Sequence, residues 1–151
     1  MKQEMLTFSR VWMVMVIVVA SLSSTGCNQR ESWQAVTYPA SGTFMVNGQP
    51  AEGAVVMLEP TTGFVDRRQS RPWASVTSSG QFKLTTYENG DGAPEGEYKI
   101  LLVWPTHGTL EQKDRLNGKY GMPENPFAVV TIKPGKNELP PVDLKDVQIT
   151  K

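Results

Sequence analysis

The chain has 151 residues with 15 basic and 15 acidic side chains, so its formal net charge is zero. This length suits one globular domain, and a balanced charge without a basic run argues against a nucleic-acid partner, which needs concentrated Lys and Arg. The 13 glycines and 11 prolines indicate short strands and turns rather than long helices.

The first 26 residues have the pattern of a secretion signal. Lys2 and Arg10 place positive charge before an unbroken apolar run at 11–20, and small residues follow at 21–26. Ten residues of helix rise about 15 Å, half of a hydrocarbon core about 30 Å thick, which disfavours a stable membrane span. Residues 1–26 are therefore predicted to be a signal peptide that directs export.

Cys27 is the only cysteine, so it has no disulfide partner within the chain. The segment before it resembles a bacterial lipobox, with Thr25 and Gly26 immediately before the cysteine. The resemblance implies that Cys27 is lipidated and becomes the first residue of the mature protein. Ordinary signal cleavage that leaves a free thiol, and a retained membrane anchor, are the alternatives. Residues 27–40 are predicted to be the lipidated cysteine followed by a polar tether.

From residue 41 to 151, short apolar runs alternate with turn residues, which predicts one β domain. The run 97–104 is apolar on both faces, so it is expected to be a central strand with Tyr98 and Trp104 in the core. Only 109–116 has room for a helical turn or two. The predicted strands are 43–46, 54–58, 74–77, 81–87, 97–104, 128–132 and 139–144, with a further edge strand at 147–150.

About seven short strands at regular spacing predict an all-β fold, a single antiparallel β-sandwich. Asn47-Gly48, then Gly53 to Pro60, then Gly80 to Leu84, resemble the carboxypeptidase-regulatory-like, transthyretin-like domains. That resemblance implies a transthyretin-like or immunoglobulin-like sandwich.

A second resemblance is to the small uncharacterised lipoproteins that are numerous in planctomycete-type bacteria. It is carried by residues 90–99, 114–120 and 137–144. It implies a place at the cell envelope and no established activity.

The sequence lacks a catalytic cluster. His107 is the only histidine, and although Glu111 and Asp114 follow it closely, no nucleophile-elbow motif is present. We expect His107 to be an exposed loop residue. One histidine and one cysteine also disfavour a zinc or other transition-metal site. The chain is therefore predicted not to be an enzyme and to carry no cofactor.

The segment 87–97 combines oxygen-bearing side chains with three glycines, which suits a hard cation such as Ca²⁺. The alternative is an ordinary loop whose acids are solvated, because the spacing does not match an EF-hand. The candidate cation residues are Glu88, Asn89, Asp91, Glu95 and Glu97.

Trp73 is the best candidate for an exposed aromatic that contacts a ligand. It follows Arg71 and Pro72 in a segment predicted to be irregular, at the end of an exposed loop over 60–72 that also holds Arg67 and Arg68. Sugars stack on exposed aromatic faces, so Trp73 suggests a carbohydrate platform.

These observations predict a lipid-anchored cell-envelope protein on the periplasmic or surface side of a membrane, held there through Cys27. Its non-catalytic domain is expected to have a structural or binding role toward an envelope protein or polysaccharide. The alternative is a glycan- or Ca²⁺-binding accessory module of an exported enzyme.

Overall fold

The computed structural model describes residues 30–106 and 113–150. Cys27 and the predicted signal peptide lie outside the described residues, as do His107 and Glu111. The chain divides into a segment Met1–Ser32 and a compact unit Trp33–Lys151, and the fold below is that of the second unit. Within the part described, no helix is long and apolar enough to cross a membrane.

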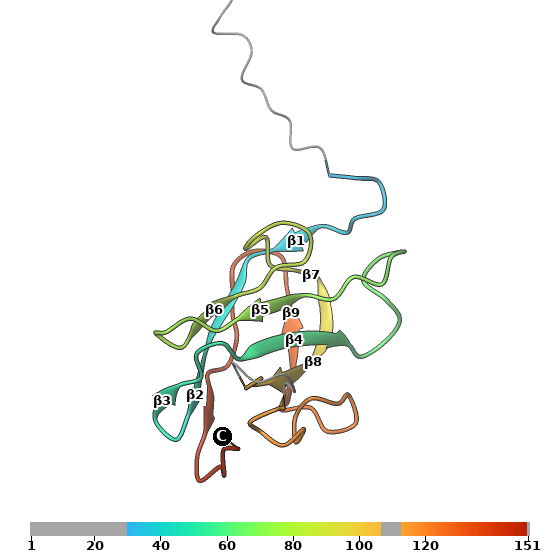
Figure 1. The fold of residues 1–151 in the computed structure, drawn as a ribbon. Helices are drawn as coiled ribbons and strands as arrows, with labels where there is room; N and C mark the ends of the chain where they lie inside the picture. The colour runs from blue at the N-terminus through green and yellow to red at the C-terminus, as the bar shows by residue number, and fades with distance from the viewer. Residues whose placement is uncertain (1–29, 107–112, 151) are drawn as a thin grey trace, which may run out of the picture. The chain divides into compact units, whose positions relative to one another are not determined.

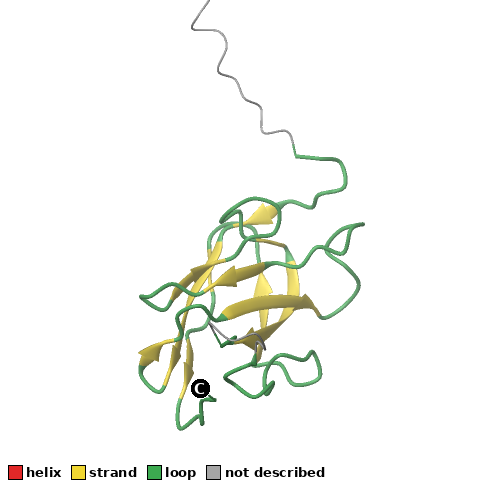
Figure 2. Ribbon diagram, viewed as in Figure 1, coloured by secondary structure: helices red, strands yellow, loops and turns green. Residues whose placement is uncertain are grey.

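All regular structure in the described residues is β, which confirms the all-β prediction (Figures 1 and 2). The predicted strands at 43–46, 54–58, 74–77, 81–87, 97–104 and 128–132 each overlap an observed strand. The described strands are β1 (Thr37–Tyr38), β2 (Ala40–Val46), β3 (Gln49–Pro50), β4 (Val55–Pro60), β5 (Trp73–Ser75), β6 (Gln81–Lys83), β7 (Ala93–Pro94), β8 (Gly96–Val103), β9 (Ala128–Ile132), β10 (Asn137–Glu138) and β11 (Val142–Leu144).

One sheet is antiparallel and has the order β5-β4-β8-β9. β8 pairs with β4 over six positions and with β9 over five, so it lies in the middle of the sheet as its two apolar faces predicted. Leu101 and Leu102, which point to opposite faces of β8, are both buried.

The second large sheet is centred on β2. β3 and β6 pair with β2 antiparallel, whereas β10 and β11 pair with it in parallel. The prediction of an entirely antiparallel arrangement is therefore wrong for β10 and β11. The predicted strand 139–144 is also interrupted, because Pro140 and Pro141 have no N–H to donate to a ladder.

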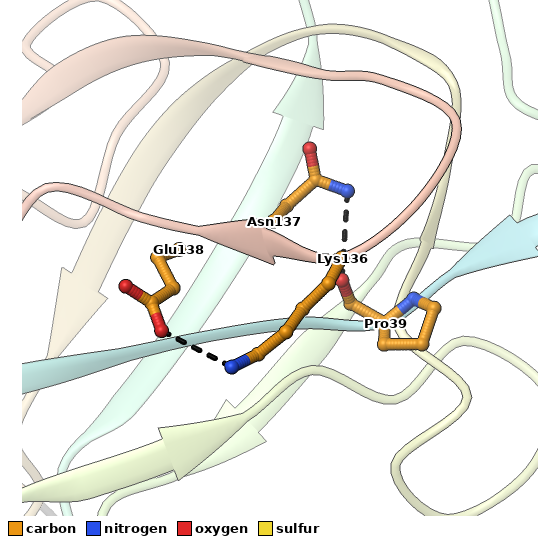
Figure 3. Close-up of polar contacts among 4 residues, drawn as sticks. All are labelled: Pro39, Lys136, Asn137 and Glu138. Carbon is orange, nitrogen blue, oxygen red and sulfur yellow. Dashed lines mark hydrogen bonds and ion pairs between the residues drawn. The ribbon is translucent and has the colours of Figure 1, made fainter.

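The turn that leads into β10 is closed by Asn137. Its side-chain oxygen accepts the N–H of Lys133 at 3.0 Å, and its amide nitrogen donates to the carbonyls of Lys133 and Gly135, each at 2.9 Å. The same nitrogen lies 3.5 Å from the carbonyl of Pro39, and the neighbouring Lys136–Glu138 ion pair is exposed (Figure 3). Asn137 thus joins the turn to the residue before β2.

The hydrophobic core joins residues of both large sheets in one cluster. Phe44 from β2, Leu58 from β4 and Ile100 from β8 are fully buried. Tyr98 and Trp104 are core residues, as predicted. Burial raises the pKa of Tyr98 to about 12, because a phenolate is poorly solvated there, and the Tyr98 hydroxyl donates to the carbonyl of Pro94 at 2.9 Å.

The N-terminal end of the β domain extends further back than residue 41. The chain is already packed at Trp33, whose ring meets Tyr87 edge-on at 5.4 Å between centroids. The N–H of Ala35 donates to the Tyr87 hydroxyl at 3.1 Å, and β1 then pairs with β7 in a small third sheet. Residues 33–40, expected to belong to the tether, are therefore part of the domain.

Two further predictions differ from the structure. Residues 147–150 form no strand; Val147 and Ile149 instead pack against the core, and Val147 exchanges two hydrogen bonds with the side chain of Asn47. Of the segment 109–116, the described part, residues 113–116, contains a turn and no helix.

Candidate binding site at Trp73

Trp73 begins an edge strand. Its N–H donates to the carbonyl of Thr85 at 2.9 Å, and the N–H of Thr85 donates back at 2.8 Å. The prediction that Trp73 lies in an irregular segment is therefore wrong: Trp73 is the first residue of β5, held beside the segment that follows β6 (Figure 1).

Alternation of side chains along these two strands builds one outward face. In β5, Trp73 and Ser75 are exposed while Ala74 is buried. In β6, Gln81 and Lys83 are exposed while Phe82 is buried. Because alternate residues of a strand point to opposite faces, the buried residues fix the aromatic ring and the polar side chains toward solvent. We call this surface the Trp73 face: Trp73, Ser75, Thr77, Gln81, Lys83, Thr85 and Asn89.

The Trp73 face borders an open depression of about 650 Å³, lined by Trp73, Ala74, Ser75, Thr77, Gln81, Phe82, Lys83, Thr85 and Asn89. A second depression of about 370 Å³ lies on the other side of β6, over β2 and β10, and shares Gln81, Phe82 and Lys83 with the first. β6 thus forms a low ridge between two hollows, which gives an extended ligand room along the surface.

Trp73 differs from the other tryptophans that the structure describes. The ring of Trp33 carries the guanidinium of Arg68 at 3.9 Å, and the ring of Trp104 carries that of Arg115 at 4.1 Å. Trp104 is also buried and donates its indole N–H to the carbonyl of Glu52 at 2.9 Å. Trp73 is 48% exposed, and no described residue stacks on its ring or accepts its indole N–H.

Some of the polar groups around Trp73 are also available to a ligand. Among the described residues, the ammonium of Lys83 has no ion-pair partner, and the side-chain amides of Gln81 and Asn89 make no hydrogen bond. None of the residues that line the depression around Trp73 is acidic. Two hydroxyls at this surface, those of Thr77 and Thr85, already form hydrogen bonds within the domain. The surface therefore offers an aromatic plate, two side-chain amides, a serine hydroxyl and one positive charge.

The acidic loop has a different organisation from the predicted cation site. Asp91 accepts the N–H groups of Thr86 and Tyr87 at 2.7 and 3.1 Å, so both carboxylate oxygens bind the loop's own backbone. Glu95 and Glu97 are exposed on either side of Gly96, where β8 begins. Nowhere in residues 30–106 and 113–150 do three His, Cys, Asp or Glu side chains gather as a metal site needs.

A second polar cluster holds the N-terminal segment to the domain. The Tyr87 hydroxyl donates to Asp66 at 2.7 Å, and Asp66 also accepts the N–H groups of Arg68 and Ser70. Burial alone raises the pKa of Asp66, but the hydrogen bonds from Ser70, Tyr87 and Arg68 outweigh it and hold that pKa below its usual value. Burial, with the hydrogen bond to Asp66, raises the pKa of Tyr87 to about 12. At neutral pH this pair is a carboxylate and a phenol.

Asp114 has a structural role. Its carboxylate accepts the N–H groups of Trp104, Leu116 and Gly118 at 2.8, 3.0 and 2.8 Å. Both oxygens are therefore bound to backbone N–H groups, and Asp114 organises the turn that follows Trp104.

The sequence identified Trp73 but missed its partners Gln81, Lys83 and Thr85. The alternation of polar and apolar residues along 81–85 does predict that Lys83 and Thr85 share the polar face of the strand. What the pattern did not reveal is that this strand lies beside Trp73. Comparisons of the chain with family models, with curated proteins and with solved structures found no match.

Proposed function

We propose that this chain is an exported, lipid-anchored cell-envelope protein whose non-catalytic β domain binds carbohydrate on the Trp73 face. The observation that supports carbohydrate binding is the half-exposed ring of Trp73, which has no partner in the domain, among amide, hydroxyl and ammonium groups. Pyranose rings have apolar faces that stack on tryptophan, and hydroxyl groups around their edges that accept from and donate to such side chains.

Covering the exposed ring of Trp73 with the apolar face of a ligand lowers the free energy. A tryptophan side chain buries up to about 250 Å² when covered, and apolar burial contributes about 25 cal/mol per Å². Covering the whole exposed half of Trp73 is thus worth up to about 3 kcal/mol.

The proposal extends to the fold and its relatives. We propose that the two large sheets, which share one core, form a single β-sandwich of the transthyretin-like kind. We also propose that the chain belongs to the small envelope lipoproteins, on the residues that carry that resemblance, 90–99, 114–120 and 137–144. Neither proposal adds a catalytic residue.

Replacing Trp73 with alanine is expected to weaken carbohydrate binding at least tenfold while leaving the fold intact, because the side chain is exposed and the Thr85 pairing uses only backbone. The measurement is isothermal titration calorimetry of the fragment 28–151 with cello-, chito-, xylo- and galacturono-oligosaccharides, a readout that does not depend on the tryptophan that is removed. Trp73→Phe, which keeps an aromatic face, should retain part of the affinity.

Phe64→Ala is the matched control, because Phe64 is an exposed aromatic that does not line the depression around Trp73. Equal binding by the Trp73→Ala variant and the parent domain would contradict the proposal. So would a complete absence of saturable binding across the four sugars.

Replacing Cys27 with alanine is expected to move most of the protein from the membrane fraction to the aqueous fraction, because the acyl group cannot be attached without the thiol. The measurement is fractionation of cells that produce the full chain, together with incorporation of labelled fatty acid. Incorporation of labelled fatty acid into the Cys27→Ala variant, or retention of that variant in membranes washed with high salt, would contradict the lipid anchor.

A further inference from the structure

The loop between β4 and β5, residues 61–72, presents an exposed aromatic beside positive charge. Phe64 is 67% exposed, whereas its neighbour Val65 packs against the core. Val65 therefore anchors the loop, and Phe64 is left in solvent at the loop's outer side. We call Phe64, Arg67 and Arg68 the Phe64 patch.

The loop is held in a fixed conformation. The side chain of Asp66 accepts the N–H groups of Arg68 and Ser70 at 2.7 and 3.1 Å, which closes a turn immediately after Val65. At the two ends of the loop, Thr61 donates its N–H to the carbonyl of Glu97, and Pro72 is buried. The exposure of Phe64 is thus built into the loop, and binding need not first order a flexible segment.

The loop is positive on a domain that is slightly negative. Residues 61–72 contain three arginines and one aspartate, a net charge of +2, whereas residues 33–151 contain 12 basic and 13 acidic side chains, a net charge of −1. Arg71 is paired with Glu59 at 2.9 Å. Arg67 has no ion-pair partner among the described residues, and Arg68 lies over the ring of Trp33, where its charge is not neutralised.

The contact between Arg68 and Trp33 also places the patch close to the predicted anchor. Only five residues separate Cys27 from Trp33 in the sequence. Six residue steps span at most about 20 Å when fully extended, so a lipid on Cys27 holds Trp33 within that distance of the bilayer.

We propose that the Phe64 patch is a second membrane contact, which docks on a bilayer rich in anionic phospholipid. Phe64 enters the headgroup region while Arg67 and Arg68 contact lipid phosphates. This inference rests on the proposed anchor for its position, but the surface itself does not need the anchor to bind. Its function is orientation: two contacts fix which side of the domain faces the membrane, and a single flexible tether does not.

The test is cosedimentation of the fragment 28–151, which lacks Cys27, with vesicles of phosphatidylcholine alone and with 40% phosphatidylglycerol. We expect binding to the anionic vesicles that falls with added salt. Phe64→Ser and Arg67→Glu are each expected to lower the partition coefficient about tenfold, from lost apolar burial and from a reversed charge.

Val129→Ser and Lys133→Glu are the matched controls, because they change an exposed apolar residue and an exposed cation elsewhere on the domain. Equal loss in the controls, or no preference for phosphatidylglycerol, would overturn the proposal. If the proposed lipid anchor is wrong, only the distribution of the Cys27→Ala chain in cells differs from the expected result. Vesicle binding by the fragment 28–151, which lacks Cys27, does not depend on the anchor and is unaltered.

Discussion

Replacing Gly92 with alanine is expected to destabilise the domain by about 4 kcal/mol or more, a large part of the roughly 5–15 kcal/mol by which a domain is stable. Gly92 has φ +92°, and a Cβ there would overlap the carbonyl of Tyr38 and lie 2.8 Å from the Cα of Pro39. Both neighbours are backbone atoms, so no side-chain rotation relieves the overlap. Because Gly92 sits where β1 meets β7, the substitution also separates that pair. Urea unfolding followed by circular dichroism measures the loss.

Gly90→Ala is the control for Gly92→Ala, because it lies in the same loop and also has a positive φ, +75°. A Cβ on Gly90 meets nothing within 4 Å, so only the cost of a left-handed alanine remains, about 1 kcal/mol. Equal destabilisation by the two variants would show that backbone conformation alone, and not the approach of Tyr38, requires Gly92.

Replacing Asp114 with alanine is expected to lower the free energy of unfolding by about 3 kcal/mol. Three backbone N–H groups, those of Trp104, Leu116 and Gly118, lose their acceptor, and Trp104 and Leu116 are buried. Asp114→Asn keeps one side-chain oxygen and should lose about half as much. Thermal and urea unfolding of the three proteins give the comparison.

Asp143→Ala is the matched control, because Asp143 is an exposed aspartate whose side chain forms only a surface ion pair with Lys145 at 3.5 Å. Such pairs contribute little, so its loss is expected to cost less than about 1 kcal/mol. If Asp114→Ala unfolds at the same urea concentration as Asp143→Ala, the carboxylate does not organise the turn that follows Trp104.

Strand positions could be predicted because burial leaves a two-residue period in the sequence. Phe82 and Lys83 show this period clearly, and the structure buries the first and exposes the second. The apolar residues on both faces of β8 likewise indicated a central strand, and β4 and β9 lie on its two sides.

Pairing direction could not be predicted in the same way. An alternating strand has the same pattern whether its neighbour runs parallel or antiparallel, so nothing in 137–144 distinguishes the two arrangements. That residues 33–40 belong to the domain could not be predicted either. Trp33 and Ala35 show no period, because they dock through a ring contact and one hydrogen bond to Tyr87, a residue more than 50 positions away.

The candidate site was likewise predicted only in part. Trp73 was expected to be exposed because its segment was predicted to be irregular; it is exposed, but as the first residue of β5, and its companions were not predicted. Lys83 joins Trp73 only because Thr85 pairs with the tryptophan backbone, a contact between segments whose register the sequence does not specify. The roles of Asp91 and Asp114 could not be predicted either. A carboxylate that binds backbone N–H groups looks the same in the sequence as one that is free to bind a cation.

The parallel pairing of β10 and β11 with β2 has a consequence for how the chain matures. β2 is one of the first strands of the domain, yet one of its two sides is completed by residues 137–144, almost 100 positions later. The sheet therefore cannot close while the C-terminal part is still being synthesised or threaded through a membrane. If the chain is exported from its N-terminus, as proposed, this sheet stays open for the whole of translocation and closes only after the last strands arrive beside β2.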